Sequence, residues 1–167
     1  MAYPSSYSPI SSTVGIDLNN ASTTQLFALG TKCFGSNNSE WIYVQAATSV
    51  TAYKAVSINS TFTCGMASGA DFLLAQQETA WAQTSIPASS FAWVVRRGDS
   101  VGVMCTGSVS ANNQLFLAAS GTPTGMCSIS ASASGTLYGV TLVSVVDTAL
   151  ATVHTAVLTW PRGVAPQ

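Results

Sequence analysis

Charge is what this sequence has least of. Only 7% of its 167 residues are Asp, Glu, Lys or Arg, against about 25% in an ordinary soluble domain. Acids and bases nearly balance, giving a formal net charge of −1, so no basic field would attract a nucleic acid. Ser, Thr, Asn and Gln supply the polarity instead. Because burying a charge costs several kcal/mol even after relaxation, we expect this charge-poor surface to pack against other proteins.

Long apolar runs are also missing. No stretch approaches the ~18 consecutive apolar residues that a membrane-spanning helix needs, so we expect no membrane partner. The first ten residues, MAYPSSYSPI, have neither the basic start nor the apolar stretch of a signal peptide. We therefore expect the protein to be made and folded in a reducing cytoplasm.

Paired cysteines and phosphate-binding glycine loops are absent too. The four cysteines, Cys33, Cys64, Cys105 and Cys127, are widely spaced, and there is one histidine. Zinc sites need ligands grouped in pairs on tight turns, which favours buried free thiols over a metal site, with a disulfide as the alternative. We expect no cofactor and no metal.

Short strand-like stretches, rich in β-branched and aromatic residues, dominate the rest of the sequence. They recur every 10 to 14 residues and are separated by turn-forming Gly, Pro, Asn and Ser. They span residues 40–46, 51–58, 80–86, 91–97, 101–106, 114–118, 136–146 and 151–160. The pattern predicts an all-β domain over residues 26–160, either an antiparallel β-sandwich of jelly-roll type or a small barrel.

The two ends lack this periodicity. Residues 1–25 carry two prolines and many Ser and Thr, and predict an extended N-terminal arm. The arm still holds Tyr3, Tyr7, Ile10 and Val14, which favours an arm that lies on a neighbouring subunit over a disordered leader. Residues 161–167 are expected to form a C-terminal tail.

One motif matches a catalytic motif of hydrolases. Residues 98–102, GDSVG, match G-x-S-x-G, and Ser100, Asp147 and His154 follow the chain order of α/β-hydrolase triads. That motif needs a strand–turn–helix elbow, whereas residues 101–105 read as a strand, so we expect a hairpin turn at residues 97–100. With a period of two, His154 shares a face with Ala156, Leu158 and Trp160. We interpret it as a half-buried strand histidine and expect no enzymatic activity.

Aromatic and arginine side chains are the remaining candidates for a binding surface. Trp41, Trp81, Trp93 and Trp160, with tyrosines such as Tyr138, could line a sugar-binding groove, but such residues also dominate cores and interfaces. Arg96 and Arg97 point to opposite faces of one predicted strand. We expect one arginine to meet an acid across a subunit boundary and the other to be solvated.

Several soft motifs together cover roughly residues 29–145, at residues 29–31, Gly35, 40–46, 53–56, 80–83, 86–88, 91–95, Gly98 and 138–142. These motifs resemble the capsid decoration, or cement, proteins of tailed bacteriophages. The resemblance implies a small β-fold, commonly a homotrimer, that binds the major capsid protein on the exterior of the virion head after synthesis in the host cytoplasm. Three symmetric contacts would act together through effective concentration.

The sequence therefore predicts a structural virion protein that cements a capsid lattice. A carbohydrate- or receptor-binding virion module is the alternative. The candidate residues for contact with the capsid or with sister subunits are Tyr3, Tyr7, Ile10, Val14, Arg96, Arg97 and Trp160.

Overall fold

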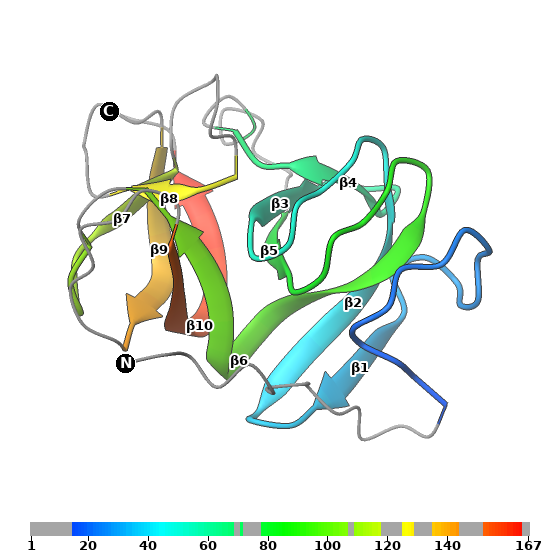
Figure 1. Ribbon diagram of the computed structural model, residues 1–167, viewed down its shortest axis with the longest axis horizontal. Coiled ribbons are helices and arrows are strands. Elements are labelled where there is room, and N and C mark those ends of the chain that lie inside the picture. The colour runs from blue at the N-terminus through cyan, green and yellow to red at the C-terminus, as the bar shows by residue number, and fades with distance from the viewer. Residues whose placement is uncertain are drawn as a thin grey trace.

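The computed structural model describes residues 15–68, 71, 78–106, 109–117, 125–128, 135–143 and 152–164 (Figure 1). Tyr3, Tyr7, Ile10 and Val14, four of the expected contact residues, lie outside the described residues, as does Asp147 of the hydrolase-like order.

The described residues are all-β, as the sequence predicts, and contain no α-helix. Ten strands lie within them: β1 (Lys32–Gly35), β2 (Ser39–Ala46), β3 (Ala55–Ile58), β4 (Thr63–Met66), β5 (Glu78–Ala82), β6 (Phe91–Cys105), β7 (Leu115–Leu117), β8 (Cys127–Ser128), β9 (Gly135–Leu142) and β10 (Thr152–Val164).

Five strands close a small barrel in the order β2, β4, β3, β5 and β6, because β6 pairs with β2 as well as with β5. In this ring β2 and β4 run parallel and the other neighbours run antiparallel. Strand β1 extends the sheet from the outer edge of β2. Of the two architectures that the sequence allows, the small barrel is the correct one.

The other strands lie outside this ring, at the left of Figure 1. Strand β10 pairs with the second half of β6, and β9, β7 and β8 follow in order. Cys105 of β6 is the parallel partner of Cys127 of β8. Strands β10, β9, β7 and β8 therefore close a second ring with the second half of β6, which we call the second circuit. The single residue pair Cys105–Cys127 closes it.

Alternation along the strands sorts the apolar side chains into two clusters. Even-numbered residues of β2, β5 and β6, such as Ile42, Ala80 and Val94, fill the barrel interior. Odd-numbered residues of the same strands face outward, yet Trp41, Trp81 and Trp93 are buried there in a second cluster that continues into β7, β9 and β10. One apolar layer therefore joins the barrel to the second circuit.

Strand β6 is a single strand of 15 residues, which corrects the predicted hairpin at residues 97–100. Its first half pairs with β2 as far as Arg97, and its second half pairs with β10 from Arg97 onward. Gly98 fits tightly at this junction, since a Cβ there would lie 3.1 Å from the Ser39 Cβ. Partners on both halves hold the Gly-Asp-Ser segment extended despite its turn-forming residues.

Several predicted boundaries also move. The stretch at residues 51–58 becomes strand only from Ala55, because Tyr53 has a φ of 65°. Before residue 26, Leu18 is buried in the core and Ser22 pairs with Phe91, so the folded domain begins earlier than predicted. Strand β10 continues past residue 160 to Val164.

Candidate functional site

Among the expected contact residues, the structure describes Arg96, Arg97 and Trp160, and it brings Arg96 and Trp160 together. Arg96 is an even-numbered residue of β6, so it follows Ala92 and Val94 on the inward side of the barrel and stands at its end. Arg97 is the ladder partner of Glu40, and the register between β2 and β6 shifts next to this pair, between Glu40 and Trp41. The expectation that Arg97 points to the opposite face therefore stays a prediction.

Two acids meet Arg96 at the end of the barrel, one from each neighbouring strand. Arg96 Nη1 lies 3.7 Å from Glu40 Oε1, and Arg96 Nη2 contacts Glu78 Oε1. Lys32 Nζ lies 3.9 Å from the same Glu40 oxygen. The Arg96 and Glu40 side chains are only 12% and 8% exposed. Arg96 thus finds its acids within its own chain.

This ion cluster at the barrel end consists of Lys32, Glu40, Glu78 and Arg96. Sequence reasoning missed both acids, because they lie far apart in the chain. Alternation along each strand could have indicated them, because Glu40 lies two residues before Ile42 and Glu78 two residues before Ala80, and both of these apolar residues face the barrel interior.

Burial outweighs the nearby cations at Glu78. Desolvation raises the pKa of this carboxyl above its ordinary value of 4.5, although the Arg96 and Lys32 charges act to lower it. A half-buried carboxylate pays a solvation penalty that two neighbouring positive charges only partly offset. Glu78 therefore takes up a proton at a higher pH than an ordinary glutamate does.

Trp160 covers the guanidinium of Arg96. The Arg96 Cζ lies 5.0 Å from the centroid of the Trp160 ring, within cation–π range. The register between β9 and β10 shifts between Leu158 and Arg162, and Trp160 has a φ of 55°, which is rare for a bulky residue. The expectation that Trp160 shares the buried face of His154 is therefore wrong, since the irregularity turns Trp160 outward and leaves it 49% exposed.

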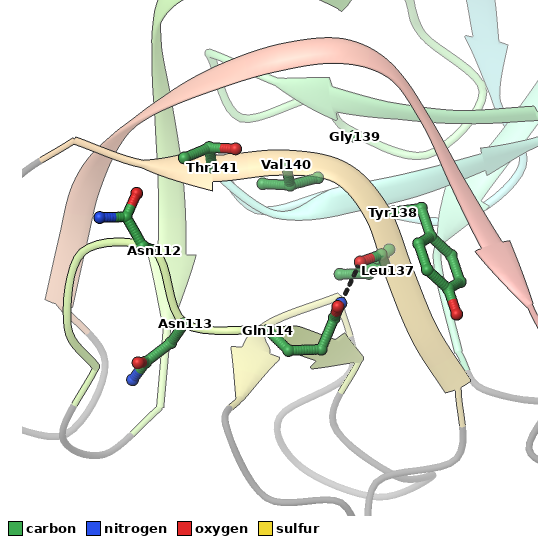
Figure 2. A pocket seen from close by; sticks show the side chains of 8 residues that line it. All are labelled: Asn112, Asn113, Gln114, Leu137, Tyr138, Gly139, Val140 and Thr141. Atoms are coloured by element: carbon green, nitrogen blue, oxygen red, sulfur yellow. Dashed lines mark hydrogen bonds between the residues drawn. The ribbon is translucent and has the colours of Figure 1, made fainter.

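A small pocket opens on the second circuit, between the turn at Asn112–Gln114 and residues 137–141 of β9 (Figure 2). Its volume is about 310 Å³. Tyr138 at one end is 48% exposed. The sequence predicts this turn but gives no sign of a pocket, because β9 and the turn meet only in the folded chain.

The hydrolase-like motif has no catalytic geometry in the described residues. Ser100 lies inside β6, and the strand continues to Cys105, so no strand–turn–helix elbow forms there. His154 lies on β10 opposite Val103 and is buried beside Ala156 and Leu158, as predicted for a strand histidine. The motif is part of a β-ladder.

No disulfide joins the four cysteines, all of which are described and buried. Burial raises the pKa of the Cys64 thiol to about 12. The pKa of Cys127 is raised well above its usual range, first by a hydrogen bond with the Cys105 thiol and then by burial. Such thiols behave as small apolar side chains and react poorly as nucleophiles.

Two other classes of site are absent from the part of the chain that the structure describes. No three His, Cys, Asp or Glu side chains are grouped there as a metal ion would require. No helix in those ranges has the length and hydropathy needed to cross a membrane.

Comparison with known proteins gives no relative from which a function could be carried over. No family model matches the sequence, and none of the curated proteins matches it significantly.

Proposed function

We propose that this protein is a structural virion component that binds the outside of a phage capsid lattice and stabilises the head. Its partners are the major capsid protein and two further copies of the same chain. The proposal rests on the motifs that resemble cement proteins, on the all-β barrel, and on the scarcity of charge. It assigns the chain no catalytic step.

The charge balance is the observation that carries this proposal. The whole chain has 5 Lys and Arg and 6 Asp and Glu. Four of these residues form ion pairs with one another at the barrel end, namely Lys32, Glu40, Glu78 and Arg96. The other charged residues, 7 of the 11 in a chain of 167, leave the rest of the surface poor in ionised groups. Covering such a surface with protein requires little desolvation of charge, which suits a permanent place in a lattice.

Trp160 is the best anchor for that contact. Half of its surface is exposed, its ring is held in place by Arg96, and its backbone adopts a strained conformation. A tryptophan that is ordered before binding loses little side-chain entropy when it is covered, and residues of this type dominate interface energies. Strain at an exposed aromatic residue is itself a pointer to function.

Co-sedimentation with expanded capsids, assembled from the major capsid protein encoded in the same genome, tests the proposal. We expect binding that changes less than about threefold between low and high salt, because few charges take part. Trp160→Ala should weaken it at least about 30-fold. Thr159→Ala, an exposed neighbour on the same strand, is the matched control and should bind normally.

A monomer by light scattering that does not sediment with capsids would contradict the proposal. Equal binding by Trp160→Ala and Thr159→Ala would contradict only the role of Trp160 as the anchor.

The alternative function was a sugar-binding groove lined by the four tryptophans, and most of these tryptophans cannot line a groove. Trp41, Trp81 and Trp93 are buried in the core and are not accessible to a ligand.

A further inference from the structure

The pocket beside β9 is formed by a fork in the sheet. Strand β7 pairs with β9 only as far as Leu115 opposite Leu137. Next to this pair the chain turns away, with Asn112 at a φ of 64° and Asn113 N–H donating to Ser110 O. Gln114 spans the fork, since its Nε2 donates to Leu137 O at 2.6 Å and to Leu115 O at 3.2 Å. The pocket therefore has two walls that the backbone fixes.

One wall offers backbone hydrogen-bonding groups. Val143 N–H donates to Thr155 O on β10, and in an antiparallel ladder successive residues point their N–H and C=O groups to opposite sides. Val140, paired with Leu158, therefore points its N–H and C=O away from β10 and toward the pocket. No strand among the described residues pairs with β9 on that side beyond Leu137. A ligand could satisfy both groups of Val140.

The opposite wall offers carboxamides. In Figure 2 the Asn112 side chain points toward β9 at Thr141, and the Tyr138 ring stands beyond Leu137 at the other end of the pocket. None of the described residues that line the pocket is charged. An amide group both donates and accepts, as does the Thr141 hydroxyl. The site thus presents mixed donors and acceptors, an aromatic face and no ionic partner.

We propose that this pocket binds one or two units of a neutral sugar. Adjacent hydroxyls of a sugar ring each donate and accept, which matches amide, hydroxyl and backbone partners set side by side. The apolar face of a sugar ring suits the exposed Tyr138 ring. The volume of about 310 Å³ is at the small end of ligand pockets. With no cation in the lining, the site has nothing to bind a phosphate or an acidic sugar.

An extended peptide fits these observations less well. Strand addition gains its affinity from a row of unpaired backbone groups, and here the turn at Asn112–Gln114 stands across from β9 and limits that row. Peptide binding is therefore kept as an outcome of the test.

Titration of the isotope-labelled full chain with neutral monosaccharides, followed by amide chemical shifts, tests the proposal without any capsid. The probes are glucose, galactose, mannose and N-acetylglucosamine at up to about 50 mM, since one small site gives millimolar affinity. We expect at least one sugar to shift the Val140 amide and the Asn112 and Gln114 side-chain amides. N-acetylneuraminic acid, which carries a carboxylate, should leave these signals unchanged.

Asn112→Asp removes a donor while tolerating the positive φ, and it should weaken the sugar response about fivefold or more. Asn38→Asp is the matched control, because Asn38 is also exposed at a φ of 54° and lies away from the pocket. Its affinity should equal that of the unchanged chain. The same spectra report whether each variant is folded.

No shift with any neutral sugar overturns the proposal, whichever way the variants behave. Shifts at Val140 with an uncharged tetrapeptide, and none with sugars, would overturn it in favour of strand addition. Because capsid binding is measured separately, either proposal can fail while the other stands.

Discussion

Arg96 is the residue on which the charge balance at the barrel end depends. It holds Glu40, which is nearly buried, and Glu78, and its guanidinium supports the Trp160 ring. A single side chain therefore connects the stability of the barrel to the surface proposed for binding. Lys cannot replace it fully, because only the planar guanidinium offers a fork of donors together with a flat face for stacking.

Arg96→Ala is expected to lower the free energy of unfolding by about 3 kcal/mol, because removing one partner of a buried ion pair leaves the other charge uncompensated. Lys32 remains near Glu40 but is largely exposed. Urea unfolding measures the change. Arg97→Ala, which has no ion pair among the described residues, is the control and should cost about 1 kcal/mol or less. Equal losses in the two variants would show that the ion cluster contributes nothing specific.

Glu78 should make stability depend on pH. Its folded-state pKa is raised above the ordinary 4.5, so the unfolded chain releases this proton first as pH rises. The Glu78 contribution to stability is therefore present below pH 4.5 and is lost as pH rises through the folded-state pKa. Glu78→Gln, which imitates the protonated acid, should show a smaller fall in unfolding free energy between about pH 4 and pH 7.

Urea titrations of both proteins across that pH range supply the comparison, since every other titrating group is common to the two. A smaller fall in the unchanged protein than in Glu78→Gln would mean that Arg96 outweighs burial and lowers the pKa.

At the scale of elements, the irregular pairing of β9 with β10 has two consequences. It turns Trp160 outward, and it brings Gly139, at a φ of 74°, close to the backbone of Thr159. A Cβ at Gly139 would lie 2.6 Å from the Thr159 carbonyl oxygen. Backbone atoms cannot swing aside, so only glycine fits here.

Gly139→Ala should therefore destabilise the fold by about 2 kcal/mol more than Gly15→Ala. Both glycines have positive φ, but a Cβ at Gly15, at a φ of 85°, would meet nothing within 4 Å. The pair of variants separates the conformational cost, which both share at about 1 kcal/mol, from the clash, which only Gly139 has. Guanidinium unfolding provides the values, and equal losses would show that β9 and β10 adjust to the extra methyl group.

Composition and alternation predict most of the strands, because they depend on local pattern. Strands β2, β5, β9 and β10 lie where β-branched and aromatic residues are dense. Strands β1, β4 and β8 were not predicted, since each is at most four residues long and too short to show a clear pattern of alternation. The continuity of β6 is also a tertiary effect, because β2 and β10 override the turn residues of its centre.

The candidate sites were predictable only in part for the same reason. Arg96 and Trp160 stand out as residue types, but their contact depends on the irregularity in β10. The acids that hold Arg96 and the two walls of the pocket are assembled from separate strands, so no window of sequence contains them.

At the scale of the whole molecule, β6 is the common strand of the barrel and of the second circuit. Five of its side chains, Trp93, Val95, Val101, Val103 and Cys105, belong to one apolar cluster that spans both parts. Neither part can lose this strand without exposing the core of the other. We therefore expect the chain to unfold as a single cooperative unit, even though its sheet closes twice.

Two probes test this expectation. The fluorescence of the buried Trp41, Trp81 and Trp93 reports on the side of the shared apolar layer that the barrel strands supply, while thiol labelling of a chain with Cys33 and Cys64 replaced by Ala reports on Cys105 and Cys127, where the second circuit closes. In urea the two midpoints should agree within about 0.2 M. Labelling that begins while the tryptophans are still buried would show that β7, β8 and β9 open on their own, and that β6 holds the barrel without them.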